Sequence, residues 1–187
     1  RAHASQAGMS LPRRLAIIDV ESTGAHPVRD RITEIAILRI EDGEVVARWE
    51  SLVAPGQAIP PLIEQVTGIS DAMVADAPPF EAVADTVAAL LEGCVFVAHS
   101  ARFDYGFIRN AFTRIGREFA APVLCTVKLS RALFPEHHRH GLDALIERHG
   151  LVCAARHRAM GDVEVLWQFV RQVEAAFAPE VLARAVE

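Results

Sequence analysis

Four acidic residues occupy positions that the surrounding sequence otherwise fills with apolar side chains. Asp19 and Glu21 are two residues apart at the end of the apolar run 15–20, so in a strand their side chains share one face. Asp104 and Asp162 each precede apolar residues at +3, +4, +7 and +11. In a helix this spacing places each carboxylate on the inward, apolar face.

Inward-facing carboxylates are costly unless a cation or a hydrogen-bond donor relieves them. A single acid in the first turn of a helix is explained by the helix dipole, and a strand pair by exposure or by a partner arginine. Two such helical acids together with a same-face strand pair favour a shared cation site. Ligands that are all oxygen suit Mg²⁺ or Mn²⁺ and not zinc. Four carboxylates around two such ions are the arrangement needed for in-line attack on a phosphodiester.

The histidines and cysteines offer fewer candidates. His157 lies five residues before Asp162 in a predicted loop and is a candidate general base, because imidazole titrates near neutral pH. We interpret the His-His-Arg-His stretch at 137–140 as a solvated loop, because its spacing suits no tetrahedral zinc site. The widely spaced cysteines form neither a zinc knuckle nor a disulfide framework, which predicts a reduced, cytoplasmic setting; they are Cys94, Cys125 and Cys153.

The elements that must position these residues are three leading strands followed by alternating strands and helices. Strands are predicted over 15–20, 32–40, 45–53, 94–98 and 122–125, with Asp42-Gly43 as a hairpin turn between the second and third. Helices are predicted over 60–66, 80–91, 101–115, 126–134, 142–149 and 159–177, with short helical pieces beginning near Ser70 and after Pro179. This order predicts an α/β domain with a mixed sheet.

Length and composition set the outer bounds. The chain has 187 residues and 51% hydrophobic content, which suits one domain, expected over residues 11–187. Residues 1–10 are small and polar, so they are no signal peptide, and we expect them to be disordered or left over from expression. No apolar run is long enough to span a membrane. The net charge of −5 argues against nucleic-acid binding by bulk charge, so a nucleic-acid enzyme would rely on metals, local arginines or a tethered partner.

Four segments, in order, resemble motifs of the DEDDh (DnaQ-like) 3′→5′ exonucleases. The first motif is matched by Asp19-Val-Glu21-Ser-Thr-Gly24, the second by Ala98-His-Ser-Ala-Arg-Phe-Asp104, the third by His157-Arg-Ala-Met-Gly-Asp162, and an intervening segment by Val66-Thr-Gly-Ile-Ser-Asp71. The similarity runs from about residue 15 to about residue 173. The stretches 103–107 and 67–69 are most similar to the proofreading epsilon subunit of bacterial DNA polymerase III and its relatives.

The resemblance implies a ribonuclease-H-like fold, in which helices flank a five-stranded mixed sheet. It implies two divalent metal ions, Mg²⁺ or Mn²⁺, and stepwise release of nucleoside 5′-monophosphates from a DNA 3′ end in proofreading or repair. By position, Asp19, Glu21, Asp104 and Asp162 match the metal ligands and His157 matches the base. Residues that match substrate-binding positions are Ser22, Thr23, Val66, His99, Ser100 and Phe103. Of these, Phe103 fits core packing equally well, and Ser100 stands where family members often carry Asn.

Two alternatives stay open. An RNA-trimming exonuclease of the same family is one, since no residue unambiguously reads a 2′-hydroxyl. A catalytically silent docking module is the other, and the five intact catalytic positions disfavour it. The expected partner is a nucleic-acid 3′ end and not a membrane. A DNA polymerase or a fused domain is a further candidate partner, and the chain could be part of a longer protein. Because no partner is predicted for its carboxylate, Asp162→Ala is expected to abolish hydrolysis and leave the fold intact.

Overall fold

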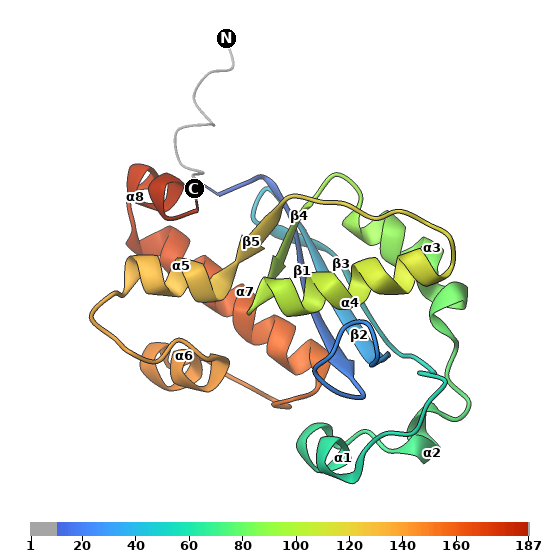
Figure 1. Cartoon of the computed structure of the whole chain (residues 1–187). Coiled ribbons are helices and arrows are strands. Elements are labelled where there is room, and N and C mark those ends of the chain that lie inside the picture. Colours follow the sequence, from blue (N-terminus) through green and yellow to red (C-terminus); the bar gives the residue numbers. More distant parts are fainter. Residues whose placement is uncertain (1–10, 187) are drawn as a thin grey trace.

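One mixed sheet organises the chain in the computed structural model, which describes residues 11–186 (Figure 1). Its strands are β1 (Arg14–Ser22), β2 (Ile32–Glu41), β3 (Glu44–Leu52), β4 (Val95–Ala98) and β5 (Val123–Cys125). They lie in the order β3-β2-β1-β4-β5. β1 is antiparallel to β2 and parallel to β4, and β4 is parallel to β5. The predicted five-stranded mixed sheet is therefore confirmed, whereas the expectation for residues 1–10 lies outside the described residues.

The central strands are apolar because helices cover both of their faces. In β1, Leu15 and Ile17 face one core cluster while Ala16 and Ile18 face the other. The hairpin between β2 and β3 uses Asp42 and Gly43, both with positive φ, as the Asp-Gly signal predicts. β3 alternates exposed and half-buried residues, which is typical of an edge strand with one face toward solvent.

Eight helices complete the described part of the chain: α1 (Pro61–Thr67), α2 (Asp71–Val74), α3 (Phe80–Leu91), α4 (Ala101–Arg114), α5 (Thr126–Leu133), α6 (Leu142–His149), α7 (Ala159–Ala176) and α8 (Pro179–Ala185). Helices α3 and α4 pack on one face of the sheet. Helices α5 to α8 contribute to the core on the other face. Helices α1 and α2 stand apart from these two layers (Figure 1) and share a small apolar cluster. No described helix is long and apolar enough to cross a membrane.

Apart from element boundaries that shift by one residue, two details differ from the sequence expectations. The first strand was expected to end at residue 20, but β1 continues through Ser22, because Glu21 still pairs across the ladder with Glu34 of β2. The stretch 137–140 was interpreted as a solvated loop, which is wrong for its last residue. His140 is buried, with Nδ1 2.7 Å from Ser130 Oγ and Nε2 2.9 Å from the carbonyl oxygen of His137. A buried imidazole with both nitrogens satisfied is a structural side chain.

The parallel strands bring the candidate residues to one edge of the sheet. β1, β4 and β5 all run the same way, so their carboxyl ends lie side by side. Asp19 and Glu21 lie in the last part of β1, and α4 with Asp104 begins just after β4. Between β4 and α4, Ser100 adopts a left-handed conformation with φ 67°, which turns the chain sharply into the helix. Ligands of open α/β sheets bind at this edge.

Candidate active site

Three of the four predicted acids meet at the end of β1. Asp19, Glu21 and Asp162 each offer one carboxylate oxygen, and these three oxygens lie within 4.8 Å of one another. The first two come from β1 and the third from the first turns of α7, which packs against β1 and β2. We call these three residues the acidic trio. Groups this close, drawn from distant segments, require either protonation or a cation.

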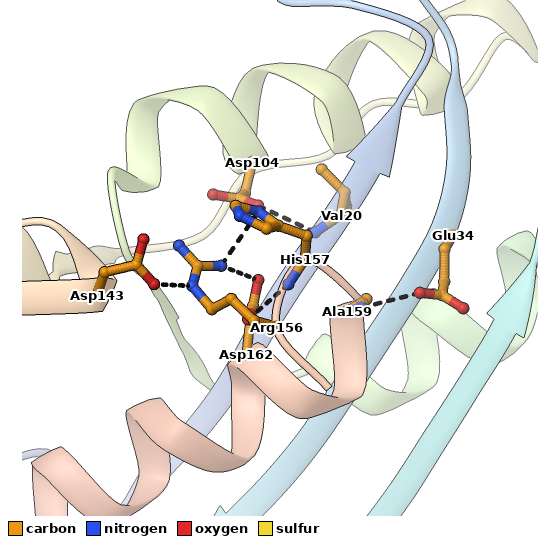
Figure 2. A network of polar contacts seen from close by, with 8 residues as sticks. All are labelled: Val20, Glu34, Asp104, Asp143, Arg156, His157, Ala159 and Asp162. Carbon is orange, nitrogen blue, oxygen red and sulfur yellow. Dashed lines mark hydrogen bonds and ion pairs between the residues drawn. The ribbon is translucent and has the colours of Figure 1, made fainter. Parts of the chain in front are cut away.

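The fourth acid, Asp104, is buried beside the trio but lies outside it. Its Oδ1 accepts a hydrogen bond from the backbone N–H of Val20 at 3.0 Å (Figure 2). This contact ties the first turn of α4 to the strand that carries Asp19 and Glu21. The inward orientation predicted from the helical spacing is confirmed for both Asp104 and Asp162, which are 2% and 5% exposed.

The site concentrates several negatively charged carboxylates where they are poorly solvated. Burial raises the pKa of Asp19 well above its usual value, and the charges of Asp104 and Glu21 raise it further. Burial, reinforced by the charge of Asp162, raises the pKa of Glu21 to about 8. Among the described residues, Asp19 Oδ2 is buried without a hydrogen-bond partner. An orphaned carboxylate oxygen inside an all-oxygen cluster fits a hard divalent cation.

A short segment before α7 places Arg156 and His157 beside Asp162, the member of the trio that Figure 2 shows. Arg156 donates from Nη1 to Asp162 Oδ2 at 2.8 Å and from Nε to Asp143 Oδ1 of α6 at 2.6 Å. The backbone N–H of His157 donates to Asp162 Oδ1 at 3.3 Å. His157 has φ 66°, a conformation that non-glycine residues rarely adopt and that is common at functional sites. The predicted base therefore lies directly beside a predicted metal ligand.

An ion pair between a buried glutamate and a partly exposed arginine fixes the start of α7, and sequence reasoning missed it. Glu34 of β2 is 3% exposed, and its carboxylate accepts hydrogen bonds from Arg158 Nη2 at 2.6 Å and from the backbone N–H of Ala159 at 2.8 Å. The second contact provides a hydrogen-bond acceptor for a backbone N–H in the first turn of α7, which has no partner within the helix. The available signal was Glu34 itself, an acid near the start of the mostly apolar strand β2. The ion pair between Arg156 and Asp143 was missed too. Arg156 lies in a loop, where no periodicity indicates which residue it contacts.

The predicted substrate contacts from the first motif lie next to the trio in sequence and structure. Ser22 and Thr23 are buried at the end of β1. Ser22 Oγ donates to the carbonyl oxygen of Gly24 at 2.5 Å, and Thr23 Oγ1 donates to Gln57 Oε1 at 2.6 Å. Val66 lies on α1 and is 49% exposed. An exposed valine on a helix offers apolar surface that packing inside the domain does not use.

The predicted substrate contacts from the second motif are of two kinds: side chains that are at least partly exposed, and one side chain that forms hydrogen bonds within the fold. Ser100 is exposed, and Phe103 is half-buried with its ring 4.8 Å from that of Phe107. His99 instead uses both ring nitrogens inside the fold, with Nδ1 2.8 Å from Thr126 Oγ1 and Nε2 2.7 Å from the carbonyl oxygen of His140. Burial lowers the pKa of His99 to about 4. These contacts favour a neutral, structural His99 that joins the end of β4 to the start of α5 and to the segment before α6.

Comparison with known proteins agrees with this geometry. A family model described as Exonuclease (RNase_T) matches residues 16–169. The chain is 43% identical over 155 residues to the 3′-5′ exonuclease DinG of Bacillus subtilis, covering 82% of this chain and 17% of that protein. It is 43% identical over 151 residues to a DNA polymerase III subunit epsilon-like protein of Rhodobacter capsulatus, covering 78% of this chain and 21% of that protein. The chain thus spans only about a fifth of these curated relatives.

Solved structures show the same fold. Exonuclease X in complex with 5′ overhanging duplex DNA superposes with a TM-score of 0.69 at 28% identity, over 92% of this chain and 99% of that one. E. coli exonuclease I in complex with a dA16 oligonucleotide superposes with a TM-score of 0.82 at 20% identity, over 92% of this chain and 43% of that one. The ribonuclease-H-like fold is thereby confirmed, and the chain belongs to the exonuclease family that its motifs resemble.

Proposed function

We propose that this domain hydrolyses the terminal phosphodiester of a DNA strand in the 3′→5′ direction with the help of divalent metal ions. The observation that carries the proposal is the acidic trio with the orphaned Asp19 Oδ2 at the carboxyl edge of the sheet. In this proposal Asp19, Glu21 and Asp162 hold the metal, and Asp104 completes the ligand set from α4. Bound divalent ions would supply a metal-activated water and charge stabilisation for the leaving oxygen.

The remaining roles follow from what the side chains touch. His157 stands next to Asp162 and accepts the proton of the attacking water, a general-base role that imidazole side chains commonly fill. Ser22 and Thr23 lie directly after Glu21 and would hold the terminal nucleotide. Exposed Val66 would pack against the terminal base. The released products would be nucleoside 5′-monophosphates.

A basic cavity on the same edge of the sheet supports an anionic, polymeric substrate. It measures about 460 Å³, and its lining includes Ser100, Arg102, Lys128 and Arg131 but no acidic residue. Three positive charges in one hollow attract phosphates. The cavity begins at the start of α4, only one helical turn before Asp104. A strand whose terminal phosphodiester lies at the trio could therefore extend toward these cations.

DNA is preferred over RNA because both solved relatives above were captured with DNA. An RNA-trimming activity is the alternative within the same family. The curated relatives are several times longer than this chain, so a fused module or a polymerase partner would supply the tethering that a net charge of −5 does not. The cytoplasmic location expected from the free cysteines stays a prediction.

One gel experiment tests direction and substrate together. Single-stranded DNA, RNA and 3′-blocked DNA, each labelled at the 5′ end, are incubated with Mg²⁺ or Mn²⁺, and EDTA provides the control. We expect a ladder of shortening products from unblocked DNA alone. A ladder from RNA but not DNA would favour the alternative substrate. Internal cleavage of the blocked strand, or undiminished hydrolysis in EDTA, would contradict the proposal.

A further inference from the structure

Arg156 forms an ion pair with the acidic trio. Within residues 11–186 it is the one basic side chain that does so, through Asp162 Oδ2 at 2.8 Å. The same guanidinium is held from the other side by Asp143, an exposed residue of α6, at 2.6 Å. Figure 2 shows Arg156 between these two carboxylates. The planar fork of arginine suits such bridging, because separate N–H groups reach separate acceptors.

The arginine and a divalent cation would both use the carboxylate of Asp162. Asp162 Oδ2 accepts from Arg156, and Oδ1 accepts from the backbone N–H of His157. A Mg²⁺ ion binds carboxylate oxygen at about 2.0–2.1 Å and prefers strict octahedral geometry. A guanidinium on that oxygen would stand within a few ångströms of the ion, where two positive charges repel strongly in a poorly solvated site. Occupation by one therefore disfavours occupation by the other.

We propose that Arg156 is a built-in counter-ion that competes with divalent cations for Asp162, and that Asp143 holds it in place to do so. This inference rests on the proposed metal site. In the absence of metal, the guanidinium offsets part of the negative charge that Asp19, Glu21 and Asp162 concentrate. When a cation binds, Arg156 leaves Asp162 and keeps its contact with Asp143. The affinity for metal is thus set by an exchange of cations, so the site fills at a higher concentration of free metal than it would without Arg156.

Calorimetric titration of Mn²⁺ into the metal-free protein tests the exchange without relying on activity. Arg156→Met removes the competitor, so we expect Mn²⁺ to bind roughly tenfold more tightly, in the usual range for coupled ligands. Arg156→Lys keeps the charge but lacks the fork that bridges Asp143 and Asp162, so its Mn²⁺ affinity should lie between those of the unchanged protein and Arg156→Met. Arg13→Met, which breaks an exposed ion pair with Asp42 at the start of β1, is the matched control and should leave the Mn²⁺ affinity unchanged.

A double-mutant cycle tests the role of Asp143 as a positioning residue. Asp143→Asn should tighten Mn²⁺ binding when Arg156 is present, and by clearly less when Arg156 is already Met. Because Asp143 is exposed, this arm stays informative even if Arg156→Met folds poorly. Equal or weaker Mn²⁺ binding by the folded Arg156→Met protein, or by Asp143→Asn alone, would overturn the inference and leave the metal site standing. If the unchanged protein takes up no Mn²⁺, the proposed metal site fails and this inference fails with it.

Discussion

Asp19 and Asp162 belong to one cluster, yet their carboxylates are in different situations. Asp162 is paired with Arg156, which corrects the expectation that it has no partner, whereas Asp19 Oδ2 is the orphaned oxygen. We therefore expect Asp162→Ala to abolish hydrolysis and to lower the stability of the metal-free protein slightly. Asp19→Asn should also abolish hydrolysis but should raise the stability, since it removes a poorly solvated charge. Thermal unfolding in EDTA measures both, and equal shifts of the two melting temperatures would contradict this assignment.

His157 is expected to act on the reaction and not on metal binding. Its backbone touches Asp162, but its imidazole does not belong to the trio. His157→Ala should reduce kcat by roughly 10²–10⁴-fold, the usual contribution of a general base, while Mn²⁺ affinity changes little. The measurement is kcat over pH 6–9 together with a Mn²⁺ titration. An unchanged pH–rate profile would remove His157 from the role of base.

The turn into α7 depends on a glycine that neither the motif nor the helical period explains. A Cβ at Gly161 would lie 2.2 Å from the backbone carbonyl oxygen of Ala155. The loop that carries Arg156 and His157 can therefore pack this closely against the helix only if residue 161 has no side chain. Gly161→Ala should displace this loop, reduce activity strongly and cost about 1–3 kcal/mol of stability, as overpacking does. Thermal unfolding and the DNA ladder assay measure the two effects.

The matched control is Gly106→Ala in the interior of α4. A Cβ there makes only ordinary contact with Pro27, and alanine favours a helix over glycine by up to about 1 kcal/mol. This variant should therefore be as stable as the unchanged protein or slightly more stable. Equal losses from the two substitutions would show that the close approach at Gly161 does not constrain the loop.

The periodic elements could be predicted from the sequence, whereas the irregular segments between them could not. The apolar runs and the Asp-Gly turn predicted every strand, and the helical period placed Asp104 and Asp162 inward. The pairing of Arg156 with Asp143 depends on a loop that brings α6 beside α7, and no local pattern encodes such a contact. The same holds for Glu34, whose partner Arg158 lies 124 residues away. The order of the motifs predicted that the catalytic acids form one site, but it could not predict which of these acids forms an ion pair.

Stability of the whole molecule should depend on pH in a direction opposite to that of ordinary surface carboxylates. The pKa of Glu21 is raised by burial to about 8, and burial also raises the pKa values of Asp19, Asp104 and Asp162. At these four acids the folded, metal-free protein therefore binds more protons than the unfolded chain between about pH 4.5 and pH 8. His99 acts in the opposite direction below about pH 6.5, because burial lowers its pKa from 6.5 to about 4. The acids therefore dominate between about pH 6.5 and pH 8. Stability falls with pH wherever the folded state binds more protons, so the site should destabilise the fold progressively across this window.

We expect the melting temperature of the metal-free protein to fall as the pH rises from about 6.5 to 8, where the raised pKa of Glu21 acts without opposition from His99, and added Mn²⁺ to reverse most of the loss at pH 8. A ligand that binds only the folded state stabilises it by mass action, and deprotonated carboxylates bind the metal best. Thermal unfolding at each pH, with EDTA or with Mn²⁺, measures both effects. In the control Glu21→Gln, which removes a titrating group, the metal-free melting temperature should depend less on pH. A metal-free protein whose stability rises steadily from about pH 6.5 to pH 8, above the range in which His99 contributes, would show that these carboxylates are already ionised at low pH.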